Sequence, residues 1–475
     1  MTNTTRTSRT TRAGRAACAA LAVAGLLTTA ACSGGSDSAT TSGGGAVVTG
    51  APAALSPSAS GFGSSGSPSA SASGGVVALT PDVTAKLDSA IQQTMTQAGV
   101  PGVIVGYTTP DGSYRKAFGL ADPTARTPMT TDLYTRIGSV TKTLTATAVL
   151  RLVDQGKMGL DDPISKYVPN VPNGDGITLR ELGDMRSGLF NYSQDPDFDQ
   201  ALLGDPTRPF TPDQLLAYSF KHPANFPPNS KFEYSNTNAI LLGLAVEKVS
   251  GQSLADFVKA QVFDPAGMKS SVFPTDASFP SPHASGVTNQ TPNGSVTDAT
   301  NWDPSWGWAA GAAISNLADL QTWSKVLATG APLLNPATQA ERLKGQGAGL
   351  PELEYAFGVF KTHGWIGHNG SLPGYQTVVV YLPAAQASLV IMTNTDISYQ
   401  GSEPSTLLAR AITQIVSPNN VYTLPTAAET GSPTAPGSPS ASPSAAPSGS
   451  PSVSPPLTPA PSGSATLHVS EGDDS

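Results

Sequence analysis

The chain has 475 residues, of which 39% are hydrophobic and 13% charged, and its formal net charge is -8. No block of basic residues accompanies this mild acidic excess, which argues against a nucleic-acid-binding surface. The 48 glycines and 42 prolines are concentrated toward the two ends, so the globular part is shorter than the chain.

Residues 1–31 have the pattern of a lipoprotein signal peptide. Arginines precede an apolar run from Ala16 to Leu27 that is too short to span a membrane. The next residues, Thr29-Ala30-Ala31-Cys32, resemble a bacterial lipobox, in which the cysteine becomes the lipid-bearing first residue. We expect export and lipid anchoring at Cys32 on the outer face of the cytoplasmic membrane; secretion without a lipid is the alternative. Because Cys18 lies in the removed segment, we expect neither a disulfide nor a cysteine-ligated metal.

Composition divides the rest of the chain into three parts. Residues 32–75 are nearly all Gly, Ser, Ala, Thr and Pro, which cannot bury enough apolar surface to fold, so they predict a disordered tether. Residues 425–475 repeat Pro-Ser and Ala-Pro steps and predict a disordered tail. We therefore expect residues 76–424 to form one compact domain.

The domain begins with a helix and a hairpin. Thr80-Pro81-Asp82 opens a helix whose apolar residues recur at every fourth position, namely Val83, Leu87, Ile91 and Met95. Two strand-like runs then flank Pro110-Asp111-Gly112, a hairpin turn signal, and they span residues 103–108 and 114–120.

The domain ends with two further strands and a helix, at residues 377–382, 388–393 and about 405–415. The long middle is mainly helices and loops. We therefore predict an α+β fold in which N- and C-terminal strands build an antiparallel sheet, flanked by helices, with an inserted, mostly helical region.

Ser139-Val140-Thr141-Lys142 is the first motif that carries chemistry. A serine hydroxyl is a weak nucleophile until a neighbouring base takes its proton, and residues three apart share one face of a helix. Helical spacing continues beyond the motif through Leu144, Ala148 and Leu152. The first turn would also aim backbone N–H groups at a developing oxyanion. The same spacing from Ser113 to Lys116 lies at a hairpin, where residues three apart point to opposite faces, so we reject it.

Two further motifs follow in order. Tyr234-Ser235-Asn236 is the only Tyr-x-Asn among 12 tyrosines, and we place it in a turn before an apolar helix at residues 239–249. His368-Asn369-Gly370 comes later, before Ser371 and a strand. This series resembles the penicillin-recognising serine hydrolases, which include class C β-lactamases, D-alanyl-D-alanine carboxypeptidases and family VIII esterases. The resemblance covers nearly all of Val83–Ile415.

The resemblance implies a role for each residue. Ser139 is the nucleophile that becomes acylated, Lys142 helps to move its proton, and Tyr234 is the general base, provided that a cation such as Lys142 depresses its pKa. The backbone N–H groups of Ser139 and Ser371 form the oxyanion hole. The remaining residues meet the substrate: Asn236, Trp306, His368, Asn369, Gly370 and Ser371.

Other hydrolase chemistries lack their signatures in this sequence. The Gly-x-Ser-x-Gly of α/β-hydrolases does not occur, and none of the five histidines pairs with another at helical ligand spacing. We therefore expect no metal and no cofactor.

The substrate is the open question. The His-x-Gly motif favours the secreted actinobacterial D-alanyl-D-alanine peptidase type, which acts on peptidoglycan-type peptides. That pattern has an arginine for the substrate's terminal carboxylate, where this chain has Phe360 with Lys361 next. A β-lactamase and an esterase are the alternative enzymes, and a penicillin-binding sensor or wall-binding lipoprotein is the non-enzymatic alternative. The sequence does not predict an oligomeric state.

Overall fold

A computed structural model of the chain describes residues 75–350 and 352–424. The predicted signal peptide, the tether apart from Gly75, the tail and Cys32 lie outside the described residues.

One large antiparallel sheet organises the described part of the chain. Its nine strands are, in spatial order, β3 (Thr127–Pro128), β2 (Gly112–Asp122), β1 (Gly102–Thr109), β13 (Ala387–Thr393), β12 (Tyr375–Leu382), β11 (Trp365–Leu372), β10 (Val359–Thr362), β9 (Leu353–Ala356) and β8 (Gln346–Gly347). Two short strand pairs lie outside this sheet: β4 (Thr135–Arg136) with β7 (Ile314–Ser315), and β5 (Val287–Thr288) with β6 (Thr297–Asp298).

Early and late strands meet at the centre of the sheet, as the sequence predicts. β1 pairs antiparallel with β13, and Val103 stands opposite Thr393. All four predicted strands are present, each within two residues of its predicted limits, as β1, β2, β12 and β13. The α+β prediction is therefore confirmed.

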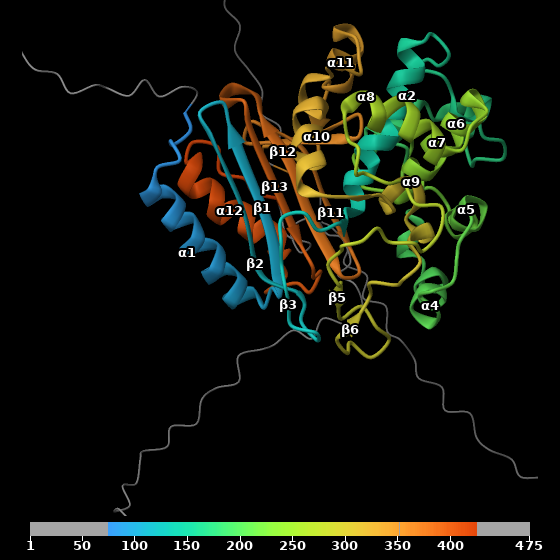
Figure 1. The fold of residues 1–475 in the computed structure, drawn as a ribbon. Coiled ribbons are helices and arrows are strands. Elements are labelled where there is room, and N and C mark those ends of the chain that lie inside the picture. The colour runs from blue at the N-terminus through green and yellow to red at the C-terminus, as the bar shows by residue number, and fades with distance from the viewer. Residues whose placement is uncertain (1–74, 351, 425–475) are drawn as a thin grey trace, which may run out of the picture. The chain divides into compact units, whose positions relative to one another are not determined.

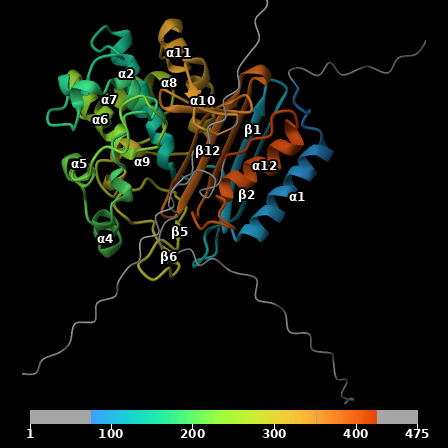
Figure 2. The same cartoon turned by 180° about the vertical axis from the view of Figure 1, so that it is seen from behind.

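Two helices cover one face of the sheet, α1 (Pro81–Ala98) and α12 (Pro404–Val416) (Figures 1 and 2). Thr80 caps α1 by accepting a hydrogen bond from the Val83 N–H, Pro81 begins the first turn, and Gly99 ends the helix with a positive φ of 66°. One buried apolar cluster contains side chains of the two helices and the side chains of β1, β12 and β13 that face them. Both helices agree with the prediction.

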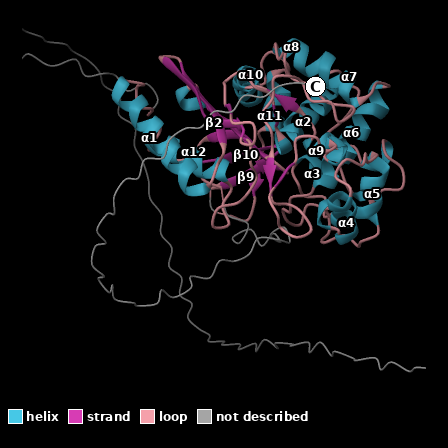
Figure 3. Ribbon diagram, turned by 60° about the horizontal axis from the view of Figure 1, so that its bottom comes forward, coloured by secondary structure: helices cyan, strands magenta, loops and turns pink. Residues whose placement is uncertain are grey.

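The other face carries the inserted helical region, and Figure 3 shows these helices apart from α1 and α12. Its helices are α2 (Thr141–Asp154), α3 (Leu179–Gly183), α4 (Pro196–Gly204), α5 (Pro212–Phe220), α6 (Asn236–Ser250), α7 (Leu254–Val258), α8 (Asp264–Ala266), α9 (Trp308–Gly311), α10 (Leu317–Thr329) and α11 (Pro336–Arg342).

Helix α2 is held in this layer by apolar and polar contacts. Leu144, Ala148 and Leu152, which the sequence places on one face, are each 0% exposed. Polar side chains fix the helix as well: the Trp323 indole N–H donates to Thr143 Oγ1 at 2.8 Å, and the Thr145 hydroxyl donates to the Ala309 carbonyl at 2.8 Å. Because buried polar groups that have partners resist displacement, the start of α2 is a rigid platform.

Asp184 is a buried carboxyl at the end of α3, and it is 5% exposed. Burial raises its pKa to about 7, against the opposing effect of Arg180 and Arg186. The folded state therefore holds this proton more tightly than the unfolded chain does. Stability associated with the group is present below its unfolded pKa near 4 and is lost as the pH rises toward 7.

The Asp184→Asn substitution removes this ionisation and should stabilise the fold at high pH. Because one pKa unit corresponds to about 1.4 kcal/mol, we expect the free energy of unfolding to rise by about 2–4 kcal/mol at pH 8. At pH 4 the two proteins should differ little. Urea unfolding at both pH values measures the difference. If the variant is less stable than the wild type at pH 8, the ionised Asp184 carboxylate is stabilised by its surroundings and the prediction is wrong.

Candidate active site

The structure brings Ser139 and Lys142 together at the start of α2. Ser139 lies in a 3-10 turn, Gly138–Val140, that runs directly into the helix, and Lys142 occupies the first helical turn. Lys142 Nζ is 2.9 Å from Ser139 Oγ. By contrast, Ser113 and Lys116 lie in β2, and the Lys116 ammonium pairs with Asp88 at 2.6 Å. The predicted distinction between the two Ser-x-x-Lys motifs is therefore confirmed.

The Lys142 amine is enclosed by protein. The residue is 2% exposed, and Nζ donates to the Ala310 carbonyl at 2.8 Å and lies 4.8 Å from the centre of the Tyr234 ring. No carboxylate among the described residues forms an ion pair with it. Burial therefore lowers the pKa of Lys142 well below its ordinary value. A neutral amine has a lone pair, and this one can accept the Ser139 proton.

Tyr234 adjoins the same pair, but its protonation differs from the expectation. Burial raises the pKa of Tyr234 above its ordinary value, although its hydrogen bond with Ser139 opposes the shift. The sequence-based role as a general base requires a neighbouring cation to depress this pKa, and the pKa of Tyr234 is instead raised. The directions of the two pKa shifts therefore favour Lys142 as the proton acceptor and a protonated Tyr234.

Strand β11 passes very close to the turn that carries Ser139. A Cβ on Gly370 would lie 2.0 Å from the Ile137 carbonyl oxygen and 3.0 Å from the Ser139 nitrogen, and a Cβ on Gly138 would lie 2.8 Å from the Ser371 nitrogen. Only glycine fits at either position. The two backbone nitrogens predicted for the oxyanion hole are thus brought side by side.

His368 is buried beside Tyr234. It is 2% exposed, and its ring centre lies 6.2 Å from that of Tyr234 and 5.3 Å from that of Phe360. The Nδ1 atom is 2.5 Å from the Asn369 carbonyl oxygen and Nε2 is 2.9 Å from the Tyr355 hydroxyl, an arrangement that assigns the proton to Nδ1. Burial lowers the pKa of His368 to about 3, so the ring is neutral. The neutral ring can accept a hydrogen bond from the Tyr355 hydroxyl and so help to hold Tyr355 beside Tyr234.

The His-x-Gly motif lies within β11, and the predicted following strand is β12. Consecutive strand residues face opposite sides, so His368 and Asn369 diverge. Asn369 Nδ2 donates to Glu403 at 2.9 Å, and Glu403 is the residue that precedes α12. Asn369 therefore ties the site strand to α12 instead of facing Ser139.

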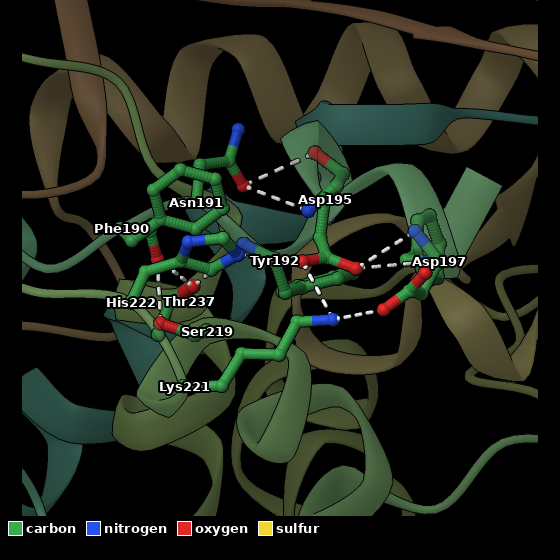
Figure 4. A network of polar contacts seen from close by, with 11 residues as sticks. Phe190, Asn191, Tyr192, Asp195, Asp197, Ser219, Lys221, His222 and Thr237 are labelled. Carbon is green, nitrogen blue, oxygen red and sulfur yellow. Dashed lines mark hydrogen bonds and ion pairs between the residues drawn. The ribbon is translucent and has the colours of Figure 1, made fainter. Parts of the chain in front are cut away.

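Asn236 begins α6, three residues earlier than the predicted start. Its N–H donates to Asn191 Oδ1 at 3.0 Å, which satisfies an open helical N–H that the Ser235 side chain leaves uncapped. Its Nδ2 donates to Ser193 Oγ at 2.9 Å. The adjacent Thr237 accepts from the Tyr192 N–H at 3.1 Å and donates to the Phe190 carbonyl at 2.7 Å (Figure 4).

A cavity of about 210 Å³ opens beside Ser139. Asn236, Trp306 and Ser371 line it, as predicted for residues that meet the substrate. The Trp306 carbonyl accepts from the Tyr192 hydroxyl at 2.7 Å, so the tryptophan is held against the loop that carries residues 190–195. Asn236 is positioned to offer its carboxamide to a bound acyl group.

The position expected for a carboxylate-binding arginine is apolar. Phe360, on β10, is 3% exposed and belongs to the cluster beneath α1 and α12. Lys361 faces the other way, where its Nζ pairs with Glu354 at 2.5 Å and donates to the Leu343 carbonyl at 3.1 Å. Lys361 therefore does not replace the missing cation.

Several residues that support the site are not predicted by the sequence analysis: Asn191, Ser193, Asp195, Tyr355 and Glu403. Asp195 has a readable local signal, because an acidic residue before Pro196 is a typical helix N-cap and it does cap α4. The contact from Asn191 to Asn236 joins residues 45 apart in sequence and has no such signal.

Metal and membrane features are absent from the described residues. No group of three His, Cys, Asp or Glu within 75–350 and 352–424 is placed to hold a metal ion. Over the same residues, no helix combines the length and apolar character needed to cross a bilayer.

Comparison with known proteins gives a consistent family assignment. The family model described as Beta-lactamase matches residues 87–413. Among curated proteins, the chain is 31% identical over 172 residues to Penicillin-binding protein 4* of Bacillus subtilis, and 34% identical over 200 residues to the esterase EstB of Burkholderia gladioli. The matches span 35% and 39% of this chain, but only 36% and 50% of those relatives.

Solved structures share the fold over a larger part of the chain. A D-stereospecific amidohydrolase from Streptomyces sp. is 29% identical with a TM-score of 0.61, and the match covers 66% of this chain and 94% of that protein.

Lys142→Met should abolish rapid acylation by a substrate or penicillin. Loss of a general base typically lowers a rate about 100- to 10,000-fold. Acylation by the wild type should slow as the pH falls through the depressed pKa of Lys142, because protonation removes the lone pair, and this acid limb should vanish in the variant. Stopped-flow acylation measured across pH tests both effects.

Lys116→Met is the matched control, because it removes the lysine of the other Ser-x-x-Lys motif and breaks only a surface ion pair. Equal loss in both variants, or an unchanged acid limb in Lys142→Met, would contradict the assignment.

Proposed function

The chain belongs to the beta-lactamase family, and from this premise we propose that it is a serine hydrolase that acts through an acyl-enzyme at Ser139. The observation that carries the proposal is the 2.9 Å approach of the buried Lys142 amine to the Ser139 hydroxyl. The relatives named as a penicillin-binding protein, an esterase and a D-stereospecific amidohydrolase are consistent with acyl transfer to a serine.

The proposed reaction follows from the protonation states. Ser139 Oγ attacks the substrate carbonyl carbon as its proton passes to Lys142 Nζ, and the backbone N–H groups of Ser139 and Ser371 stabilise the oxyanion. As the bond to the leaving group breaks, Tyr234 gives its proton to the departing atom and recovers one from Lys142. Water then hydrolyses the acyl-enzyme, which restores Ser139 and releases the acid.

For the substrate we propose D-alanyl peptide bonds of cell-wall peptides, cleaved in the manner of a D-alanyl-D-alanine carboxypeptidase. The similarity to a D-stereospecific amidohydrolase supports D-configured substrates. The apolar Phe360 and the diverted Lys361 give a free terminal carboxylate no cation to meet. We therefore propose that the enzyme accepts the peptide acid and its C-terminal amide alike.

An esterase is the second candidate. Its specific support is the same lack of a carboxylate-binding cation, together with the 34% identity to an esterase. The catalytic steps are the same for a peptide and for an ester. The preference for one of these substrates is therefore set by the pocket that binds the acyl group, not by Ser139 and Lys142.

The purified protein should label at Ser139 with a fluorescent penicillin and should hydrolyse a D-Ala-D-Ala peptide and its amide with kcat/KM within about threefold. Ser139→Ala should lose at least 100-fold of both activities, since the nucleophile is gone. A chromogenic cephalosporin and a short-chain ester complete the comparison, and rapid turnover of either would identify a β-lactamase or an esterase.

The matched control is Ser113→Ala, which alters the exposed serine of the rejected motif and should behave as the wild type. Absence of labelling and of turnover with every compound would refute the enzyme and favour a wall-binding lipoprotein.

We also propose that the protein acts outside the cytoplasmic membrane, anchored by a lipid at Cys32. The support is the sequence around Cys32. In detergent phase partitioning of cells that express the full chain, the wild type should enter the detergent phase and Cys32→Ala the aqueous phase. Equal aqueous recovery of the two proteins would contradict lipid anchoring.

A further inference from the structure

The loop and helix that form one wall of the active-site cavity carry three aspartates, and two of them form ion pairs within the protein. Lys221 Nζ pairs with Asp195 at 2.9 Å and with Asp197 at 2.5 Å, and His222 Nε2 lies 2.6 Å from Asp195 (Figure 4). Asp195 also accepts from the N–H groups of Asp197 and Phe198 at the start of α4. These two carboxylates have structural partners.

Asp199, one turn further along α4, has no such partner. Among the described residues, no lysine, arginine or histidine forms an ion pair with it. The residue is half-buried, and burial, together with the nearby charge of Asp195, raises its pKa. An opposite charge would reverse this shift, and the protein itself does not provide one.

Asp199 faces the same cavity as the nucleophile. Ser139 and Asp199 both line it, together with the apolar side chains of Phe198, Leu202 and Trp306. A carboxylate beside apolar walls exerts a stronger field than one in open water. A ligand that reaches from Ser139 into this cavity therefore meets one unpaired negative charge.

We propose that Asp199 binds a protonated amine on the acyl part of the substrate, so the substrates are amides or peptides that carry a primary ammonium group on the acyl side of the reacting bond. The proposal rests on acylation at Ser139 and specifies the substrate class of that site. Asp199 favours a cation on the acyl side, whereas Phe360 offers no partner to an anion at the end of the peptide.

The ammonium could belong to an α-amino group or to the side chain of a diamino acid, and two substrate pairs distinguish these sources. The first pair is D-alanine p-nitroanilide and its N-acetyl derivative. The second is Nα-acetyl-L-Lys-D-Ala-D-Ala with a free or an acetylated ε-amine. Acetylation removes the ammonium charge and adds an acetyl group, so the change in the ratio of kcat/KM values on Asp199→Asn isolates the contribution of the charge.

For at least one pair, the wild type should prefer the amine-bearing member by about tenfold, and Asp199→Asn should reduce that ratio to near one, since about 1.4 kcal/mol corresponds to a tenfold effect. Asp197→Asn is the control, because it removes the same charge from the same helix while Lys221 keeps its pairing with Asp195. It should retain the preference. Equal rates within both pairs in the wild type, or a ratio unchanged in Asp199→Asn, would overturn the proposal.

A binding measurement separates this proposal from the proposed activity. In the Ser139→Ala background, calorimetry with D-alanine amide and with the free-amine lysyl peptide should show about tenfold weaker binding of at least one of them after Asp199→Asn. Suppose that no substrate or penicillin acylates the wild type, while Asp199→Asn still weakens binding. The ammonium site then stands and the hydrolase proposal fails. If acylation occurs and neither ligand loses affinity, the hydrolase proposal stands and the ammonium site fails.

Discussion

The desolvation of the Lys142 amine is the constraint on which the site depends. The amine lies between the Ser139 hydroxyl, the Ala310 carbonyl and the face of Tyr234, with no carboxylate paired to it in the described part of the chain. A charge in such surroundings is costly, so the neutral form is favoured and becomes a base. The raised pKa of Tyr234 belongs to the same environment, because a tyrosinate would be equally poorly solvated.

The fold holds the site in place where helix α2 and strand β11 meet, at Gly138 and Gly370. Helix α2 is fixed in the helical layer through its apolar face and through Trp323 and Ala309. Strand β11 belongs to the central sheet and touches the Ser139 turn where Gly138 and Gly370 leave room. Because neither element can shift independently, the two backbone N–H groups and the nucleophile keep their geometry without a substrate.

The sequence predicts the parts of this arrangement that are locally encoded. Helix α1, with its Thr80 cap and fourfold apolar spacing, and the hairpin of β1 and β2 follow from patterns within a few residues, and the pairing of Ser139 with Lys142 follows from helical geometry. The protonation of Tyr234 could not be predicted, because it depends on burial by segments remote in sequence. The inward orientation of His368 likewise required the register of β11, and Asn191 reaches Asn236 only through the tertiary fold.

The proposed mechanism requires Lys142 to be a neutral amine before Ser139 reacts. Nitrogen-15 NMR of the protein with labelled lysine side chains, with the signal assigned by its loss in Lys142→Met, measures this state directly. We expect a Lys142 Nζ resonance of the neutral form at pH 7 that converts to the ammonium form only at lower pH. An ammonium signal for Lys142 that persists from pH 7 to pH 9 would contradict the account.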